Sequence, residues 1–161
     1  MEIAAEFQIV PMVIDDYDEV LALWQRTEGM GLDLEDADSR EGFTLYLRRN
    51  PGMCFTARVD GQLAGTALCG HDGRRGYLTH LAVAPEFRRR GIGSALIDRC
   101  LAMLRAEGIA RCNIFVFADN ETGRCFWERR GWMAYPNVTL MQTVTDSAKT
   151  MSLLAGTGGE K

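Results

Sequence analysis

The sequence predicts one mixed α/β domain, with a sheet of about seven strands flanked by about four helices. Three observations support this fold class. The chain has 161 residues, an ordinary length for one domain. Its composition, 47% apolar and 25% charged, is that of a globular protein. Segments of alternating and of helical periodicity follow one another in the order β-α-α-β-β-β-α-β-α-β-β.

The first half of the chain contains one strand, two helices and a hairpin. A strand over 7–12 precedes a helix over 15–24, which begins with a capping aspartate and repeats apolar residues at i, i+3, i+4 and i+7. A second helix over 38–50 follows a polar loop and ends before a proline and a glycine. Residues 53–69 alternate on either side of Asp60-Gly61, which is typical of a two-residue hairpin turn.

The second half contains the longest helix and four further strands. Pro85 ends the first of these strands, and Gly108 has the position of a helix C-terminal glycine. The elements are expected over 76–83 (strand), 91–107 (helix), 111–117 (strand), 120–131 (helix), and 132–135 and 138–144 (strands). We expect a single domain over 1–144. The remaining residues, 145–161, are rich in Thr, Ser and Gly and predict a flexible tail.

Charge and cysteine spacing exclude several classes of protein. The net charge is −4 and the isoelectric point near 5.2, which argues against a nucleic-acid-binding protein. The first residues are acidic, and no stretch has the ~20 apolar residues of a membrane-spanning helix. Five cysteines, at least twelve positions apart, fit neither a disulfide framework nor a zinc site. We therefore expect a cytoplasmic protein with no metal, membrane or nucleic-acid partner.

A basic, glycine-containing loop at 88–94 is the segment most typical of ligand binding. It lies at the start of the longest helix, where backbone N–H groups lack intrahelical partners and the helix dipole is positive. Gly91 and Gly93 leave those amides accessible to an anion. Three arginines in an acidic chain favour a phosphate-bearing ligand, although an arginine-rich surface loop is the alternative. Leu96 excludes the dinucleotide fingerprint, which needs a glycine there.

The flanking residues extend this loop into a recognisable pattern. Residues 81–96 resemble the acetyl-CoA motif of the GNAT superfamily of N-acyltransferases, whose core glycines and arginine correspond to Arg88, Gly91 and Gly93. A second motif of the family is similar to residues 118–120 and 126–132. The resemblance in element order extends from Phe7 to about Val144.

The resemblance implies a mostly antiparallel, splayed sheet with acetyl-CoA as cosubstrate between two strands. The Leu81 amide would donate to the acetyl carbonyl oxygen as negative charge develops. The cofactor-binding residues that it implies are Leu81, Val83, Arg88, Arg89, Arg90, Gly91, Ile92, Gly93, Ser94, Asn120, Phe126 and Trp127. In relatives the final strands often form dimers, so the resemblance also implies a possible homodimer.

The sequence departs from the family at the proton-transfer positions. Trp127 replaces the usual tyrosine and cannot act as an acid at neutral pH, so packing is the favoured role for its indole. Tyr77 and Phe115 stand where relatives have glutamates. Strand alternation puts Thr79 on the face of Tyr77 and His80 on the opposite face. The catalytic candidates are therefore Tyr77, Thr79 and the Leu81 backbone amide.

The expected function is N-acetyl transfer from acetyl-CoA to a primary amine, directly in a ternary complex. The acceptor is a small molecule or a protein amino group. The alternative is a non-catalytic acyl-CoA-binding sensor. An acyl-cysteine route is disfavoured because no base accompanies any cysteine. The acidic loop over 28–38 either attracts a cationic amine or is simply solvated.

Overall fold

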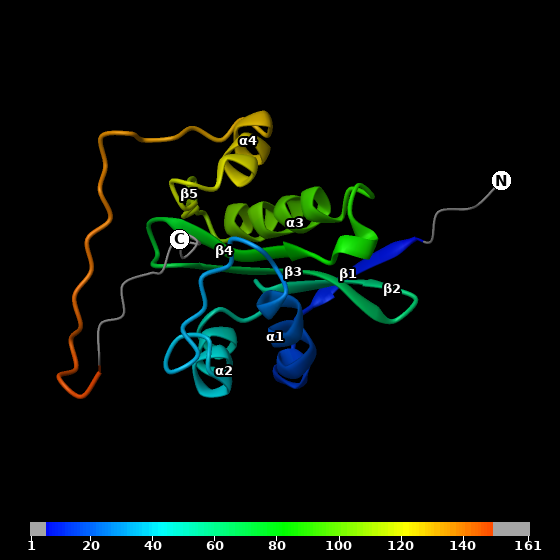
Figure 1. Ribbon diagram of the computed structural model, residues 1–161, viewed down its shortest axis with the longest axis horizontal. Coiled ribbons are helices and arrows are strands. Elements are labelled where there is room, and N and C mark those ends of the chain that lie inside the picture. Colours follow the sequence, from blue (N-terminus) through cyan, green and yellow to red (C-terminus); the bar gives the residue numbers. More distant parts are fainter. Residues whose placement is uncertain (1–5, 150–161) are drawn as a thin grey trace, which may run out of the picture. The chain divides into compact units, whose positions relative to one another are not determined.

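The computed structural model describes residues 6–149 (Figure 1). The chain divides after Phe115 into two compact units. The elements of the first unit are β1 (Phe7–Pro11), η1 (Ile14–Asp16), α1 (Tyr17–Gln25), α2 (Arg40–Arg49), β2 (Phe55–Val59), β3 (Gln62–His71), β4 (Gly76–Val83), η2 (Pro85–Phe87), α3 (Ile92–Ala106) and β5 (Cys112–Asn113). The second unit contains α4 (Glu121–Arg129). A single domain over 1–144 stays a prediction.

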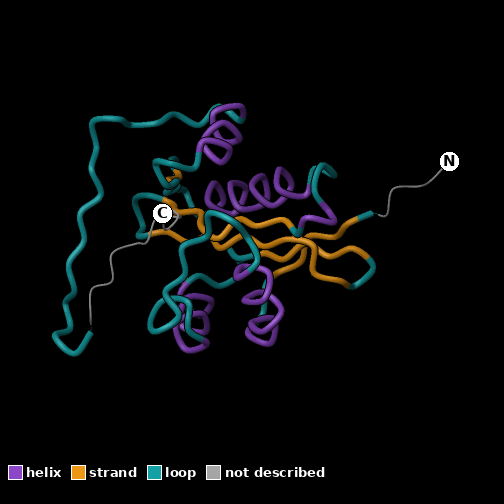
Figure 2. Tube along the Cα trace, in the orientation of Figure 1, coloured by secondary structure: helices purple, strands orange, loops and turns teal. Residues whose placement is uncertain are grey.

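The strands, drawn in orange in Figure 2, form one sheet, and their order in it is β1-β2-β3-β4-β5. Neighbouring strands are antiparallel, except β4 and β5, which are parallel. The β4–β5 ladder contains only the pairs Gly76–Cys112 and Tyr77–Asn113. Within the described part of the chain, residues 78–83 therefore have no strand partner on the β5 side. The mostly antiparallel, splayed sheet implied by the family resemblance is confirmed.

Helices cover both faces of this sheet, with α3 on one face and α1 and α2 on the other (Figures 1 and 2). A β-carbon on Gly65 of β3 would lie 3.1 Å from Ile92 and Leu96 of α3, so that helix lies directly against the strand. β3 is buried from Leu63 to Gly70 because it is paired on both edges and covered on both faces. The buried side chains of α3 are Ile92, Leu96, Ile97, Cys100 and Leu104.

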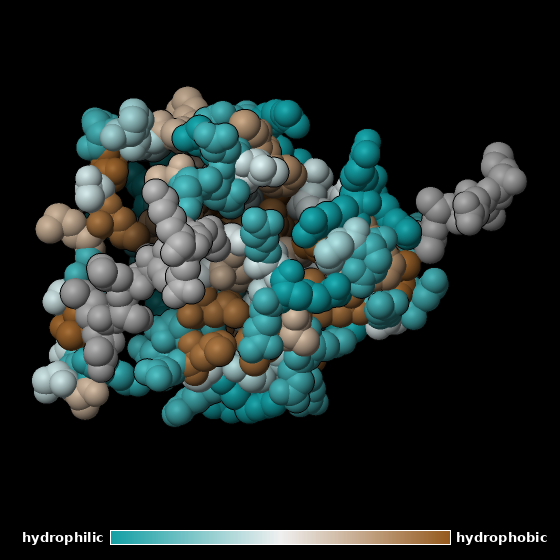
Figure 3. Space-filling view, in the orientation of Figure 1, coloured by the Kyte–Doolittle hydropathy of each residue, from teal (hydrophilic) through white to brown (hydrophobic). Residues whose placement is uncertain are grey.

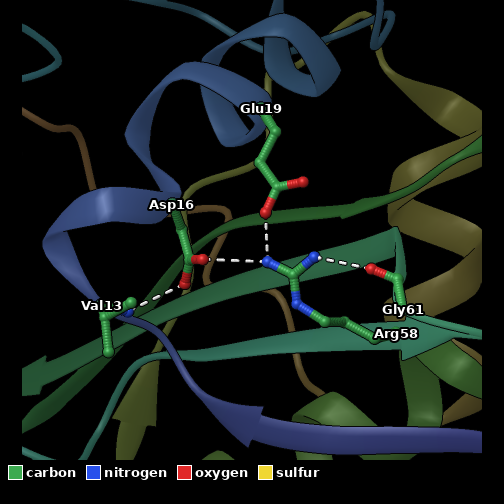
Figure 4. Close-up of polar contacts among 5 residues, drawn as sticks. All are labelled: Val13, Asp16, Glu19, Arg58 and Gly61. Carbon is green, nitrogen blue, oxygen red and sulfur yellow. Dashed lines mark hydrogen bonds and ion pairs between the residues drawn. The ribbon is translucent and has the colours of Figure 1, made fainter.

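Arg58 connects the start of α1 to the β2–β3 hairpin (Figure 4). Its guanidinium donates to Asp16 Oδ1 at 2.9 Å, to the Glu19 carboxylate, and to the Gly61 carbonyl oxygen at 3.1 Å. Asp16 also accepts a hydrogen bond of 2.9 Å from the Val13 amide. Charge-assisted bonds of this kind are stronger than neutral ones. They fix where α1 begins over the sheet, and with it the position of the buried side chains of the helix.

The predicted hairpin turn is confirmed by its backbone geometry. Asp60 and Gly61 have φ angles of 49° and 79°. Positive φ at both central residues is typical of the type I′ turn, whose twist matches that of the flanking strands.

β4 contains a bulge that the sequence did not predict. Between two regular pairs of the β3–β4 ladder, His80 and Leu81 stand opposite the single residue Ala67. His80 has a φ of 51°, in the left-handed region that few residues other than glycine adopt and in which histidine is enriched. A bulge changes the side to which nearby side chains point, so strict alternation fails at this position.

Among residues 6–149 the sheet has five strands rather than about seven. The predicted strands over 132–135 and 138–144 are not strands in the structure, and the predicted strand over 111–117 is reduced to Cys112–Asn113. Tyr135, Val138 and Met141 are 66–87% exposed. Strand residues need a hydrogen-bonded neighbour, and these make no ladder with any described residue. Of the predicted tail, 145–149 forms no helix or strand, and 150–161 lies outside the described residues.

Candidate functional site

The unpaired edge of β4 leads to the N-terminus of α3. Leu81 and Val83, the two residues expected to bind the cosubstrate through their backbone, are half-buried in this part of the strand. Arg88 Nε donates to the Val83 carbonyl oxygen at 3.2 Å, so this guanidinium is held at the end of β4. The Val83 carbonyl retains a second lone pair for another donor.

The loop after η2 has two residues with left-handed backbone, Arg89 at φ 63° and Gly91 at φ 79°. Gly91 is the N-cap of α3, and the first turn of this helix contains no acidic side chain that would compete with an anion. Arg90 lies over the Phe87 ring, 5.3 Å from its centroid. Arg88, Arg89 and Arg90 are all exposed, and hydrophilic residues gather in the part of Figure 3 where this loop lies. The loop therefore combines helix-terminal amides with exposed arginines.

Ile92 differs from its neighbours in this loop because its side chain is buried, with 1% exposed. It packs under β3 rather than toward the loop. Any contact that Ile92 makes with a ligand is therefore restricted to its backbone.

Tyr77 and Thr79 lie on the α1–α2 face of β4. A β-carbon on Gly76 would touch Leu104 of α3, so the next residue, Tyr77, points to the opposite face, and Thr79 follows it two residues on. Both are half-buried. The Tyr77 ring is stacked on Phe115 with a centroid separation of 6.3 Å. Two of the three catalytic candidates thus share one face beside the third, Leu81.

His80 also lies on this face, which corrects the argument from alternation. Its ring centroid is 4.4 Å from that of Trp24 in α1, and its Nε2 lies 2.8 Å from Oδ1 of Asp38 in the loop before α2. The bulge is the physical reason, since alternation holds only along a regular strand. The sequence pattern did not predict this His80–Asp38 pair. The only signal was a histidine, one of the few residue types that tolerate positive φ.

In the second unit, the expected ligand-binding residues form a helix cap and an aromatic cluster. Asn120 Oδ1 accepts a hydrogen bond of 2.9 Å from the Gly123 amide and so caps α4. The Trp127 ring packs edge-on against the rings of Phe126 and Trp132, with centroid separations of 5.3 Å and 4.8 Å. These contacts are those of a packed aromatic side chain.

The cysteines in the core are poorly suited to act as nucleophiles. Burial raises the pKa of the Cys54 and Cys112 thiols to about 12. The thiols of Cys69 and Cys100 are hydrogen-bonded, which lowers the pKa of Cys69 and, together with burial, raises that of Cys100. Cys69 is nevertheless fully buried, out of reach of a substrate. Only a thiolate attacks a thioester readily.

Comparison with known proteins identifies the family. The profile of the acetyltransferase (GNAT) family matches residues 17–132. An acetyltransferase of Sodalis glossinidius is 32% identical over 127 residues, covering 79% of this chain and 87% of that protein. An acetyltransferase of Photorhabdus laumondii is 38% identical over 109 residues, covering 66% of this chain and 73% of that protein. The chain belongs to the GNAT family of acetyltransferases.

Solved structures with low sequence identity share the fold. Ard1 of Thermoplasma volcanium superimposes with a TM-score of 0.70 at 21% identity, covering 81% of this chain and 84% of Ard1. The PaiA N-acetyltransferase of Thermoplasma acidophilum, solved in complex with coenzyme A, superimposes with a TM-score of 0.68 at 19% identity. The match covers 78% of this chain and 88% of that protein. Among residues 6–149, no helix combines the length and apolar character needed to span a membrane.

Proposed function

We propose that this protein is an acetyl-CoA-dependent N-acetyltransferase that acetylates a primary amine by direct transfer. The observation that supports this proposal most is that the unpaired edge of β4 leads to the N-terminus of α3, where Gly91 is the N-cap. A strand edge offers N–H and C=O groups to an amide-containing chain such as pantetheine. The helix N-terminus offers amides and a positive dipole to a pyrophosphate. The residues present therefore fit the two chemically distinct parts of the cosubstrate.

In this proposal, Leu81 and Val83 pair with pantetheine, and the pyrophosphate lies on the amides of the loop from Arg89 to Ser94. Arg88 and Arg90 contribute positive charge around that loop. Asn120, Phe126 and Trp127 complete the contacts with the cosubstrate. When bound, acetyl-CoA supplies an activated acetyl thioester.

The residues of β4 would carry the chemistry. An alkylammonium acceptor has a pKa of about 10.4, so it must lose a proton before it attacks the acetyl carbon. Tyr77 and Thr79 would hold the water through which this proton leaves. The Leu81 amide would stabilise the developing negative charge on the acetyl oxygen. The high pKa of the buried thiols supports direct transfer over an acyl-cysteine route.

Calorimetric titration with acetyl-CoA and, separately, with CoA tests the proposal. We expect micromolar binding of both, because the loop recognises the pyrophosphate that they share. An amine panel with detection of the released thiol then identifies the acceptor among small amines and peptides. If neither compound binds, the enzyme proposal is to be abandoned.

A non-catalytic acyl-CoA sensor is the second candidate, and the absence of a titratable side chain at Trp127 favours it. Trp127→Tyr separates the two functions. In an enzyme that lacks an efficient proton donor, this change should maintain or raise turnover, most visibly at low pH. A sensor would show no thiol release with either residue, at any pH and with any amine in the panel.

A further inference from the structure

His80 combines a left-handed backbone with contacts from three other segments of the chain. We infer that Trp24, Thr66 and Asp38 hold His80 in this conformation and thereby set the direction of the Leu81 N–H group. His80 is then a positioning residue for acetyl transfer. This inference rests on the proposed function, in which Leu81 donates to the acetyl carbonyl oxygen.

The backbone of His80 is fixed through its carbonyl group. Thr66 Oγ1 donates to the His80 carbonyl oxygen at 3.0 Å and accepts from the indole Nε1 of Trp24 at 2.9 Å. Thr66 and Trp24 are both buried, with 0% and 1% exposed. Because the indole can only donate and its partner must accept, the Thr66 hydroxyl proton is directed at His80. This chain of two bonds holds the peptide group between His80 and Leu81.

The side chain of His80 is fixed independently of its backbone. Its ring packs on Trp24 and is 2.8 Å from Asp38 Oδ1. Asp38 is itself held, since its other oxygen, Oδ2, accepts from the Asp33 amide at 2.8 Å. The Asp38 backbone carbonyl also accepts from the hydroxyl of Tyr17 at 2.8 Å. The histidine ring thus lies between a buried helix residue and an anchored carboxylate.

These contacts act on the reaction through the backbone rather than through the ring. Both ring nitrogens of His80 are buried, and neither meets hydrogen-bond geometry with any described residue, the 2.8 Å approach of Asp38 being an ion-pair contact. Because both of its nitrogens are buried, the ring offers no exposed nitrogen to an acceptor amine. The peptide that follows it, however, supplies the Leu81 N–H group, and a bulge turns such a group away from the regular ladder direction. Loss of the contacts would let β4 relax toward a regular strand and turn that N–H group.

The test compares acetyl-CoA with S-ethyl-CoA, a thioether that lacks the carbonyl oxygen. In the wild-type protein we expect acetyl-CoA to bind roughly fivefold more tightly, which is the value of one hydrogen bond. In His80→Ala this ratio should fall to about one, with the affinity for S-ethyl-CoA unchanged. A general structural defect would instead weaken both ligands equally. Isotope-edited infrared spectra of the bound thioester carbonyl give a second measurement, and the wild-type shift should disappear in the variant.

Thr66→Val provides a second variant that keeps the shape of the core, so the test does not depend on the folding of His80→Ala. Thr56→Val is its matched control. Thr56 pairs directly with Thr66 across β2 and β3 and is equally buried, but its hydroxyl has no partner among the described residues. We expect loss of the affinity ratio in Thr66→Val and the wild-type ratio in Thr56→Val.

The outcomes separate this inference from the function on which it rests. A wild-type ratio that persists in both His80→Ala and Thr66→Val overturns the positioning role and leaves the enzyme proposal intact. A ratio of one in the wild-type protein shows that Leu81 does not bind the carbonyl oxygen, which overturns the inference at its premise. Failure of the wild-type protein to bind either compound overturns the proposed function and the inference together.

Discussion

At the scale of single residues, Gly91 shows why the loop before α3 needs a glycine. Its φ is 79°, and a β-carbon there would meet nothing within 4 Å. The requirement therefore comes from the backbone conformation and, in the proposed function, from the room that the pyrophosphate needs, rather than from crowding within the protein. Arg89, with φ 63°, accepts a similar conformation without being a glycine.

Gly91→Val should abolish binding of acetyl-CoA and CoA, because the new side chain covers the helix-terminal amides. Left-handed backbone costs a residue other than glycine about 1–2 kcal/mol, so some loss of stability is also expected. Gly73→Val is the matched control, since Gly73 has φ 89° and equally open surroundings in the exposed β3–β4 loop. Calorimetry should find wild-type affinity in this control. Retained affinity in Gly91→Val would refute the position proposed for the pyrophosphate.

Cys54 provides a prediction about alkaline stability. Burial raises the pKa of its thiol to about 12, whereas an unfolded cysteine ionises near pH 8.5. Its contribution to stability is therefore complete below about pH 8.5 and is lost as the pH rises toward 12, because only the unfolded state releases the proton in that range. The melting temperature should fall less steeply over this range in Cys54→Ala than in the wild-type protein. Cys125→Ala, at an exposed thiol, should keep the wild-type slope.

At the scale of elements, predictions that rest on residues close together in the sequence were confirmed, whereas some that need a partner far along the chain were not. The Asp60-Gly61 turn and the long helix expected over 91–107 follow from residues close in sequence, and both are confirmed. The predicted strands after Trp132 have suitable side chains, but a strand exists only beside a partner, which sequence pattern cannot supply. The bulge at His80 was unpredictable for the same reason: it depends on register against β3.

For the candidate site, the position of the basic loop at the start of α3 was predictable, because the helix start, the glycines and the arginines are adjacent in sequence. The His80–Asp38 pair was not, because 42 residues separate its members and strict alternation gave the wrong face for the histidine. The contacts of Trp24 and Thr66 with His80 also join residues far apart in the sequence, and the sequence did not predict them. The sequence thus predicted a candidate ligand site, but it did not predict the contacts that support β4 beside it.

Asn120 has two roles to separate, as the cap of α4 and as the proposed contact with the cosubstrate. Asn120→Ser keeps a side-chain oxygen for the Gly123 amide but shortens the side chain and removes its N–H₂ donor. We expect an unchanged melting temperature and affinity for acetyl-CoA lowered roughly threefold, as for loss of one modest hydrogen bond. Asn120→Ala, which removes both functions, should lower the melting temperature as well. Wild-type affinity for acetyl-CoA in Asn120→Ser would contradict the proposed contact and leave Asn120 with its role as a helix cap alone.

At the scale of the whole molecule, acidic and basic groups are unevenly distributed. The chain has a net charge of −4, yet Arg88, Arg89 and Arg90 adjoin the N-terminus of α3. The loop between α1 and α2 contains five carboxylates. One of them, Asp38, is buried against His80, so it supports β4 and is not part of the exposed acidic surface of the loop.

The exposed carboxylates of that loop should attract a cationic amine. Glu35→Gln combined with Asp36→Asn should raise KM for an amine identified in the panel by roughly threefold in low salt, and less at high salt, where charges are screened. Glu6→Gln combined with Asp60→Asn removes the same charge from exposed positions elsewhere and should leave KM unchanged. Equal KM values in both double variants would show that the loop is merely solvated.

The short pairing of β4 with β5 also bears on how the protein behaves in storage. An unsatisfied strand edge is a template on which a strand of another molecule can assemble, which is a recognised route to aggregation. Leu78–Val83 lacks a strand partner on the β5 side within the described residues. A pantetheine chain bound there would occupy the same donors and acceptors. Purification with CoA present should therefore keep the protein monodisperse at concentrations where the ligand-free protein precipitates.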